Sequence, residues 1–141
     1  MTEFTARNYR DAFARRMDGL TAVNRLTTPE QVLHEYTNLV GQSRGGYDWE
    51  LAEYRNDMSI RDTIETLLSS GELADFPEFD RFQGRVAALD ELLDEALTEE
   101  RFPTKWTGWW HERLPIRASG VFLEELFVLH DYRAIDADSE G

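Results

Sequence analysis

The sequence has no cysteine, and its apolar stretches are short. Without cysteine there can be no disulfide framework, no thiolate nucleophile, no cysteine-ligated zinc and no iron–sulfur cluster. The first residues carry scattered charges and lack the apolar core of a secretory signal, and no apolar run approaches the length of about 18 residues that a membrane span needs. We therefore expect a cytoplasmic protein that needs no cofactor.

Positive charge is also scarce. The chain has 28 Asp plus Glu against 15 Lys plus Arg, a formal net charge of -13, and Lys105 is its only lysine. Such a charge repels phosphate backbones and anionic lipid surfaces and attracts basic surfaces. We expect no direct binding to nucleic acid or membranes, and we expect a basic protein as the partner.

The motifs of common chemistries are missing as well. The sequence has no GxSxG elbow for a nucleophilic serine. Its glycine loop, GQSRGG at 41–46, lacks the trailing lysine of a phosphate-binding loop. Pairs of carboxylates are abundant, but in a chain with this many acids they arise by chance. The sequence therefore predicts a module that is not an enzyme.

The length and composition are those of one folded domain. The chain has 141 residues, 41% of them hydrophobic and 12% aromatic, which is enough to bury a substantial core. The last six residues, DADSEG, contain no large apolar side chain. We expect a single helical domain over 1–135 and a flexible acidic tail over 136–141.

Helix signals dominate the rest of the chain. Thr28 has the features of an N-cap, with Pro29 at the first helical position and Gln31 placed to complete a capping box. Ser59 opposite Asp62 suggests a second start, and Gly71 a stop. The segment 41–57 between these two helices is expected to combine a glycine loop with a short helix around Trp49. Apolar residues at helical spacing follow each start: Val32, Leu33, Tyr36, Leu39 and Val40 in the first helix, and Ile60, Ile64, Leu67 and Leu68 in the second.

Three further segments have helical periodicity. The longest stripe is Phe79, Phe82, Val86, Leu89, Leu93 and Ala96, and another near the N-terminus is Tyr9, Phe13, Met17 and Leu20. The segment 119–132 is apolar on nearly every side, so it is expected to be the most buried helix. No hairpin signal separates alternating runs. The predicted fold is all-α, a single compact bundle of five or six helices with a short Trp-rich helix before the buried C-terminal one.

One face of the long acidic helix is a candidate partner-binding surface. Asp90, Glu91, Asp94 and Glu95 repeat one helical turn apart, a like-charge arrangement that costs about 0.2 to 0.5 kcal/mol per pair in an isolated helix. This row could dock on an arginine- or lysine-rich protein. The alternative is a solvated face that keeps the protein soluble.

The segment 104–117, TKWTGWWHERLPIR, holds three of the four tryptophans. Pro103 and Pro115 bracket it, and Thr104 or Thr107 could cap a short helix to about Arg113. Trp106, Trp109, Trp110 and Arg113 would then share one face. We expect Trp106 and Trp110 to point inward as anchors, with Trp109, His111 and Glu112 nearer solvent. Trp109 and Arg113 are added to the partner-binding residues because tryptophan and arginine often carry interface energy, and the two could stack.

The three histidines provide an alternative in another functional class. His34, His111 and His130 are each followed by an acid, and three helices of a bundle could bring them to one metal ion. No HExxH, ExxH or HxxxH spacing occurs, so no two ligands are preset on one helix face. The alternative is therefore a metal-dependent helical-bundle enzyme that uses these three histidines.

The leading hypothesis from the sequence is a non-enzymatic acidic interaction module that binds a basic protein partner. Antitoxins, immunity proteins and nucleic-acid mimics have this kind of composition, and the analogy goes no further than that. A scaffold subunit of a larger complex, or a homodimer, is a third hypothesis that the sequence leaves open.

Overall fold

The computed structural model describes residues 2–20 and 26–140, and this part of the chain is mostly helical. The five longer helices are α1 (Thr2–Asp18), α2 (Pro29–Gly45), α3 (Leu51–Leu68), α5 (Glu78–Ala96) and α7 (Gly120–His130). Three helices of four residues are α4 (Gly71–Ala74), α6 (Trp109–Glu112) and α8 (Ala137–Glu140). The parallel strands β1 (Arg117–Ala118) and β2 (Ile135–Asp136) have two residues each. The predicted all-α fold is confirmed, and the described residues form more helices than the expected five or six because the short helices α4 and α8 add to the predicted set.

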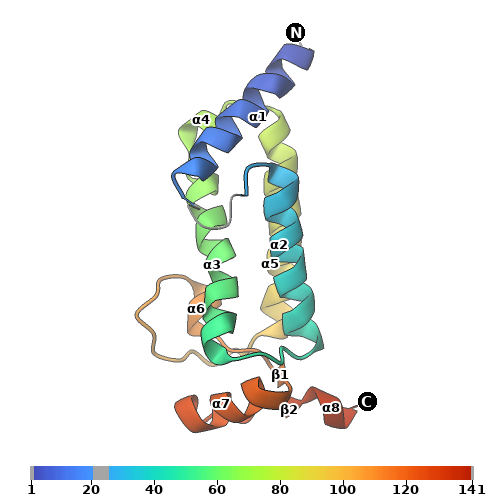
Figure 1. Cartoon of the computed structure of the whole chain (residues 1–141), viewed down its shortest axis with the longest axis vertical. Helices are drawn as coiled ribbons and strands as arrows, with labels where there is room; N and C mark the ends of the chain where they lie inside the picture. Colours follow the sequence, from blue (N-terminus) through green and yellow to red (C-terminus); the bar gives the residue numbers. More distant parts are fainter. Residues whose placement is uncertain (1, 21–25, 141) are drawn as a thin grey trace.

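Three long helices form the body of the molecule. α2, α3 and α5 stand alongside one another, α1 and α4 lie at one end, and α7 lies across the other end with β1, β2 and α8 (Figure 1). The segment between α5 and β1 forms a wide loop beside α3 and carries α6. The two termini are therefore at opposite ends of the molecule.

The start of α2 matches its prediction atom by atom. Thr28 Oγ1 accepts a hydrogen bond from Gln31 N at 3.2 Å, and Gln31 Oε1 accepts one from Thr28 N at 3.2 Å. This reciprocal capping box satisfies two backbone donors that the first turn of a helix leaves free. The local sequence therefore determines where α2 begins.

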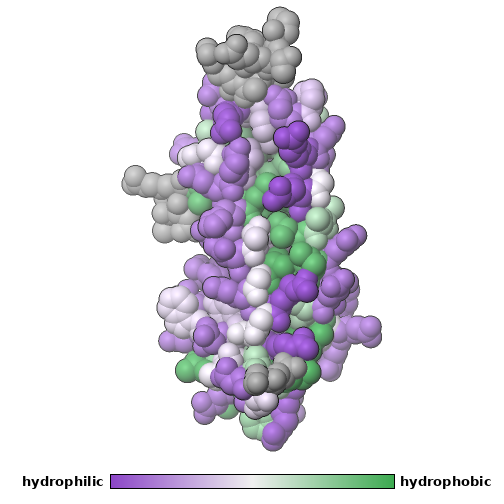
Figure 2. Space-filling model, turned by 90° about the vertical axis from the view of Figure 1, so that its right-hand side faces the viewer, coloured by the Kyte–Doolittle hydropathy of each residue, from purple (hydrophilic) through white to green (hydrophobic). Residues whose placement is uncertain are grey.

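The hydrophobic core lies between the long helices, and the predicted stripes supply it. On α5, Phe79, Phe82, Val86, Leu89, Leu93 and Ala96 are all buried, and on α1 so are Tyr9, Phe13 and Met17. Outside the core the surface is largely hydrophilic, with apolar side chains gathered on part of the face seen in Figure 2.

The predicted start of a helix at Ser59 is wrong. α3 already begins at Leu51, and the Ser59 hydroxyl donates to Asn56 O, 2.5 Å away inside the same helix. The first turn is capped from outside, because Leu51 N donates to Glu125 Oε1 of α7 at 2.9 Å. Trp49, expected on a short helix, lies before α3 and is 59% exposed.

The expectation that 119–132 is the most buried helix is also wrong. α7 buries only Phe122 and Leu126, whereas Val128 is 69% exposed and Leu129 60%. The physical reason is its position: a helix across the end of a bundle has neighbours on one side only (Figure 1). Its apolar periphery is left facing outward.

The segment 136–141, expected to be a flexible acidic tail, has regular structure over its described residues. Asp136 belongs to β2, Ala137–Glu140 form α8, and Gly141 lies outside the described part. Gly46 lets this segment approach, since its φ of 106° ends α2 and a Cβ there would lie 2.4 Å from Ala137 Cβ. None of the helices in the described ranges has both the length and the apolar character needed to span a membrane.

Candidate functional site

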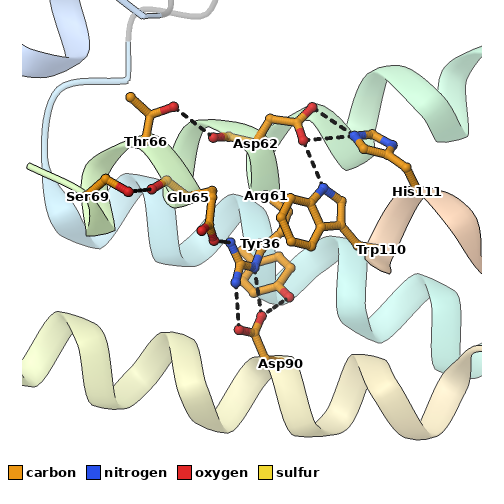
Figure 3. A network of polar contacts seen from close by, with 9 residues as sticks. All are labelled: Tyr36, Arg61, Asp62, Glu65, Thr66, Ser69, Asp90, Trp110 and His111. Atoms are coloured by element: carbon orange, nitrogen blue, oxygen red, sulfur yellow. Dashed lines mark hydrogen bonds and ion pairs between the residues drawn. The ribbon is translucent and has the colours of Figure 1, made fainter. Parts of the chain in front are cut away.

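Asp90, the first of the four acids predicted on α5, forms contacts inside the molecule. Asp90 Oδ1 and Oδ2 each accept a hydrogen bond from Arg61 of α3, at 2.9 Å from Nε and 2.9 Å from Nη2 (Figure 3). The hydroxyl of Tyr36 on α2 donates to Asp90 Oδ1 at 2.5 Å. A fork of this kind is the strongest geometry for an arginine–carboxylate pair. Asp90 therefore holds three helices together and is not a free charge.

The surroundings of this pair shift the proton equilibria of its members. Burial raises the pKa of Tyr36 far above its ordinary value, and the hydrogen bond to Asp90 raises it further. Burial alone would lower the pKa of Arg61, but its hydrogen bond to Asp90 and that carboxylate's charge outweigh burial, so the pKa rises. Both side chains keep their protons at all physiological pH values.

The other predicted partner-binding residues of α5 and Arg113 fall into two groups, one that forms an ion pair within the molecule and one that is exposed. Arg113 donates to the Asp94 carboxylate and to Thr98 O, so Asp94 and Arg113 form a surface pair. Glu91 and Glu95 lie on the exposed face of α5. The row thus keeps two outward carboxylates, and the other two are bound by arginines that lie far away in the sequence.

A second polar cluster fastens α6 to α3. Asp62 accepts a hydrogen bond from Trp110 Nε1 at 2.8 Å, and its two oxygens lie 2.8 Å and 2.9 Å from His111 Nε2 (Figure 3). The Trp110 ring covers the Arg61 guanidinium, whose Cζ is 4.4 Å from the ring centroid. Asp62 was expected to partner Ser59 at a helix start, but it is the anchor of the tryptophan segment.

The predicted tryptophan helix is much shorter than expected. Helical structure covers only Trp109–Glu112, and neither Thr104 nor Thr107 caps it. Trp110 is 5% exposed and anchors the segment as predicted, but Trp106 is 42% exposed and His111 only 2%, which reverses the expectation for both. Trp109 is partly buried, and Arg113 Cζ lies 5.8 Å from its ring centroid, as the spacing predicted.

His111 contacts Asp62 through Nε2, and its other ring nitrogen is enclosed. A catalytic imidazole uses one nitrogen to contact an orienting carboxylate and the other to contact the reacting group. His111 Nδ1 is buried and has no hydrogen-bond partner among the described residues, and the Trp106 ring lies 5.8 Å from the imidazole, centroid to centroid. The cluster holds the loop that carries α6 against α3.

The structure does not bring the three histidines together. His34 is exposed on α2 near Asn38, His111 is buried on α6, and His130 ends α7 beside Phe102. Burial, and secondarily the charge of Arg55, lowers the pKa of His130. Over residues 2–20 and 26–140 there is no group of three or more histidine or acidic side chains arranged to hold a metal ion.

The most unusual surface lies around α7. Eight large apolar side chains in the described part of the chain are exposed, and all but Leu92 lie in this region. We call these seven residues the α7 end face: Trp49, Trp106, Val121, Phe127, Val128, Leu129 and Ile135. Monomeric proteins seldom leave large apolar side chains clustered in this way.

Hollows flank α7 on both sides. A cavity of about 500 Å³ lies between Leu129, His130 and the Trp106 loop, and one of about 330 Å³ lies beside Leu123 and Phe127. The surface is therefore an apolar ridge between two depressions, a shape into which a complementary protein surface can fit.

Acidic side chains surround the same ridge. Asp48 and Glu50 are exposed on the segment that leads into α3, Glu124 is exposed on α7, and Asp131 is exposed directly after α7. Asp48 O lies 3.6 Å from where a Cβ on Gly120 would be, so that segment is next to the start of α7. Three cations also lie here: Arg133, whose Cζ is 4.4 Å from the Phe127 ring centroid, and Arg55 and Lys105, whose charged groups are 5.2 Å and 5.1 Å from the Trp106 ring centroid.

The sequence contained a signal for Arg61 that the periodicity argument missed. Tyr54, Met58 and Ile64 form the buried stripe of α3, and Arg61 occupies the position between Met58 and Ile64. A cation on a buried stripe requires an anion from another element. No comparable signal exists for the α7 end face, because only the tertiary arrangement exposes it.

Comparison with known proteins adds one similarity. Residues 43–104 match the family model of the HalX domain, a stretch that includes α3, α4 and α5 but neither α6 nor α7 and spans less than half of the chain. No curated protein and no solved structure matches significantly. The HalX-like region thus supplies Arg61, Asp62 and Asp90, while most of the α7 end face lies outside it.

Proposed function

We propose that the protein is a non-enzymatic interaction module that binds a basic protein partner through the α7 end face, in the cytoplasm. The observation that carries the proposal is the concentration of exposed large apolar side chains at this end, seven of the eight in the described ranges. Removing apolar side chains from water favours association, and tryptophan is among the residue types that most often carry binding energy at protein interfaces.

The acidic side chains at this end support a basic partner. Asp48, Glu50, Glu124 and Asp131 surround the apolar ridge, and the whole chain has a net charge of -13. A partner with an apolar strip flanked by lysine or arginine matches both features, and its approach is accelerated by the long-range field. A second copy of this chain would bring the same carboxylates against each other.

The α5 row contributes less than the sequence suggested. Asp90 and Asp94 are bound by Arg61 and Arg113, so only Glu91 and Glu95 present unshared charge there. That face also offers Leu92 alone as an exposed large apolar side chain. Charge without buried apolar area gives weak, salt-sensitive contacts.

A designed peptide tests the proposal on the full chain. The probe is a fluorescein-labelled amphipathic helix with leucines on one face and lysines on the other, and its matched control has glutamate at every lysine position. We expect the lysine peptide to bind with a change in anisotropy and the glutamate peptide not to bind. Equal binding of the two peptides would contradict the proposed charge preference.

A double variant and a single control variant locate the binding site. Val121→Ser with Val128→Ser removes apolar side chains that are 50% and 69% exposed, so the fold is not expected to suffer, and binding should weaken about ten-fold or more. Leu92→Ser, at an exposed apolar position of α5, is the control and should leave the affinity unchanged. Light scattering on the same samples tests self-association. If the wild-type chain formed a stable dimer and the double variant were monomeric, this face would bind a second copy of the chain. That result would overturn the proposal.

A further inference from the structure

A hollow with different chemistry lies at the other end of the bundle. α1, α2 and α5 meet there around a cavity of about 360 Å³. Pro29, Leu33 and Phe82 supply apolar walls. Figure 2 looks onto the side of the molecule that carries α2 and α5 and shows apolar side chains set between strongly hydrophilic ones. A volume of this size is in the range of small-molecule sites, roughly 300 to 1,000 Å³.

The charge around this cavity is opposite to that of the whole molecule. Three arginines line it (Arg10, Arg81 and Arg85) against two glutamates (Glu30 and Glu78), which leaves one positive charge in a chain of net charge -13. Arg10 is paired with Glu30 at 2.9 Å. The lining of this cavity therefore differs in charge from the rest of the chain.

Arg81 and Arg85 are the cations available for a ligand. They lie four residues apart on α5, so their guanidinium groups are neighbours on the helix surface, and both are exposed. Neither forms an ion pair with another described residue, in contrast to Arg15, Arg61, Arg101 and Arg113. Two neighbouring like charges repel, and an anion placed between them removes that cost.

The cavity wall also contains an unused hydrogen-bond donor. Tyr9 is 6% exposed, and its hydroxyl has no hydrogen-bond partner in the described part of the chain. Glu78 Oε1, an acceptor of the same lining, is also buried without a partner among the described residues. Burial, followed by the charges of Glu30 and Glu78, raises the pKa of Tyr9 to about 12, so the hydroxyl keeps its proton at neutral pH. Buried polar groups normally have hydrogen-bond partners. Tyr9 lines the cavity, so a ligand bound there could accept a hydrogen bond from its hydroxyl.

We propose that this cavity binds a small monocarboxylate with an apolar body, the carboxylate on Arg81 and Arg85 and the body against Leu33 and Phe82. A carboxylate fits the planar fork of guanidinium donors, and a single negative charge matches the single excess positive charge of the lining. This site is at the opposite end of the bundle from the α7 end face, and it does not depend on the function proposed above.

Three ligands of one shape test the charge requirement. Hydrocinnamate, its neutral amide and phenylpropylamine share an aromatic body and differ in the head group. Calorimetric titration of the full chain should show that hydrocinnamate binds. The amide should bind at least about ten-fold more weakly than the acid, and the amine should not bind. The proposal fails if the amide binds as tightly as the acid, or if the acid does not bind at millimolar concentration.

Variants locate the site. Arg81→Gln and Arg85→Gln each keep a long polar side chain, remove one charge and should lower the affinity for hydrocinnamate about ten-fold. Arg16→Gln, at an exposed position of α1 that does not line the cavity, is the control for the loss of one positive charge and should bind normally. Circular dichroism confirms that each variant is folded. Wild-type affinity in both cavity variants, or an equal loss in Arg16→Gln, would overturn the assignment.

Discussion

Arg61 and Asp90, 29 residues apart in the sequence, form a two-pronged ion pair that joins α3 to α5. The Arg61 side chain is 5% exposed and that of Asp90 23%. Tyr36 donates to the same carboxylate and Trp110 covers the guanidinium. The pair therefore connects α2, α3, α5 and α6.

Removing one member of this pair should destabilise the protein strongly. Arg61→Met keeps the volume of the side chain but leaves Asp90 as a largely enclosed carboxylate without its cation, and we expect a loss of about 3 kcal/mol of unfolding free energy. Urea unfolding followed by circular dichroism measures it. The control is Arg15→Met, which breaks a pair whose side chains are 72% and 59% exposed, and it should cost less than about 1 kcal/mol. Similar losses in the two variants would contradict the structural role of Arg61.

Two buried tyrosines should respond in opposite ways to loss of the hydroxyl. Tyr36→Phe removes the hydrogen bond to Asp90 and should cost about 1 to 2 kcal/mol. Tyr54 is fully buried, but its hydroxyl has no partner in the described residues, so Tyr54→Phe should be neutral or stabilising. Thermal unfolding of the two variants side by side checks this, and a larger loss for Tyr54→Phe would refute it.

The same phenols should make the protein sensitive to alkali. Burial raises the pKa of Tyr36 and Tyr54 above the ordinary value of 10.0, and that of Tyr9 to about 12. The stability they contribute is fully present below pH 10. It is lost as the pH rises above that value, because the unfolded chain then releases protons that the folded chain keeps.

Unfolding midpoints in urea between about pH 9 and pH 11.5 measure this effect. The slope should be negative, and Tyr54→Phe should make it shallower because one shifted phenol is gone. Lys105 is the only lysine, and Tyr47 and Tyr132, whose pKa values burial also raises, contribute to the slope of both proteins alike. An unchanged slope in the variant would show that Tyr54 is not held protonated by the fold.

Glycine should be required at only one of two positions. Gly108 has φ of 118°, and a Cβ there would lie 2.6 Å from the Trp110 ring, so Gly108→Ala should cost about 1 to 3 kcal/mol. Gly84 lies in the interior of α5 with nothing within 4 Å of an added Cβ, so Gly84→Ala should stabilise the protein by roughly 0.5 to 1 kcal/mol. Chemical unfolding of both variants gives the comparison, and losses of equal size would contradict the backbone requirement at Gly108.

Local sequence predicted those elements whose determinants are local. The capping box of Thr28 and Gln31 and the apolar stripe of α5 involve residues within a few turns of each other, and both predictions are confirmed. The start of α3 depends on Glu125, which is 74 residues away and caps Leu51 N. Periodicity cannot show that contact, and the pattern around Ser59 therefore predicts a helix start that the structure does not contain.

The candidate site was harder to predict for the same reason. The acids of α5 have the pattern of a free row, but Arg61 and Arg113 bind two of them from 29 and 19 residues away. The apolar composition of 119–132 indicates burial, yet α7 has neighbours on one side only and Val128 is 69% exposed. The composition of α7 is that of a buried helix, but its exposure depends on its position at the end of the bundle, which composition does not show.

Chemical-shift mapping of the full chain with the leucine and lysine peptide tests the central claim most directly. In proton–nitrogen spectra recorded during a titration, the account predicts that the largest shifts fall on the amides of α7 and of residues 48–50, with residues 91–95 of α5 little affected. Shifts centred on Glu91 and Glu95, with α7 unchanged, would contradict the assignment of the α7 end face as the binding surface.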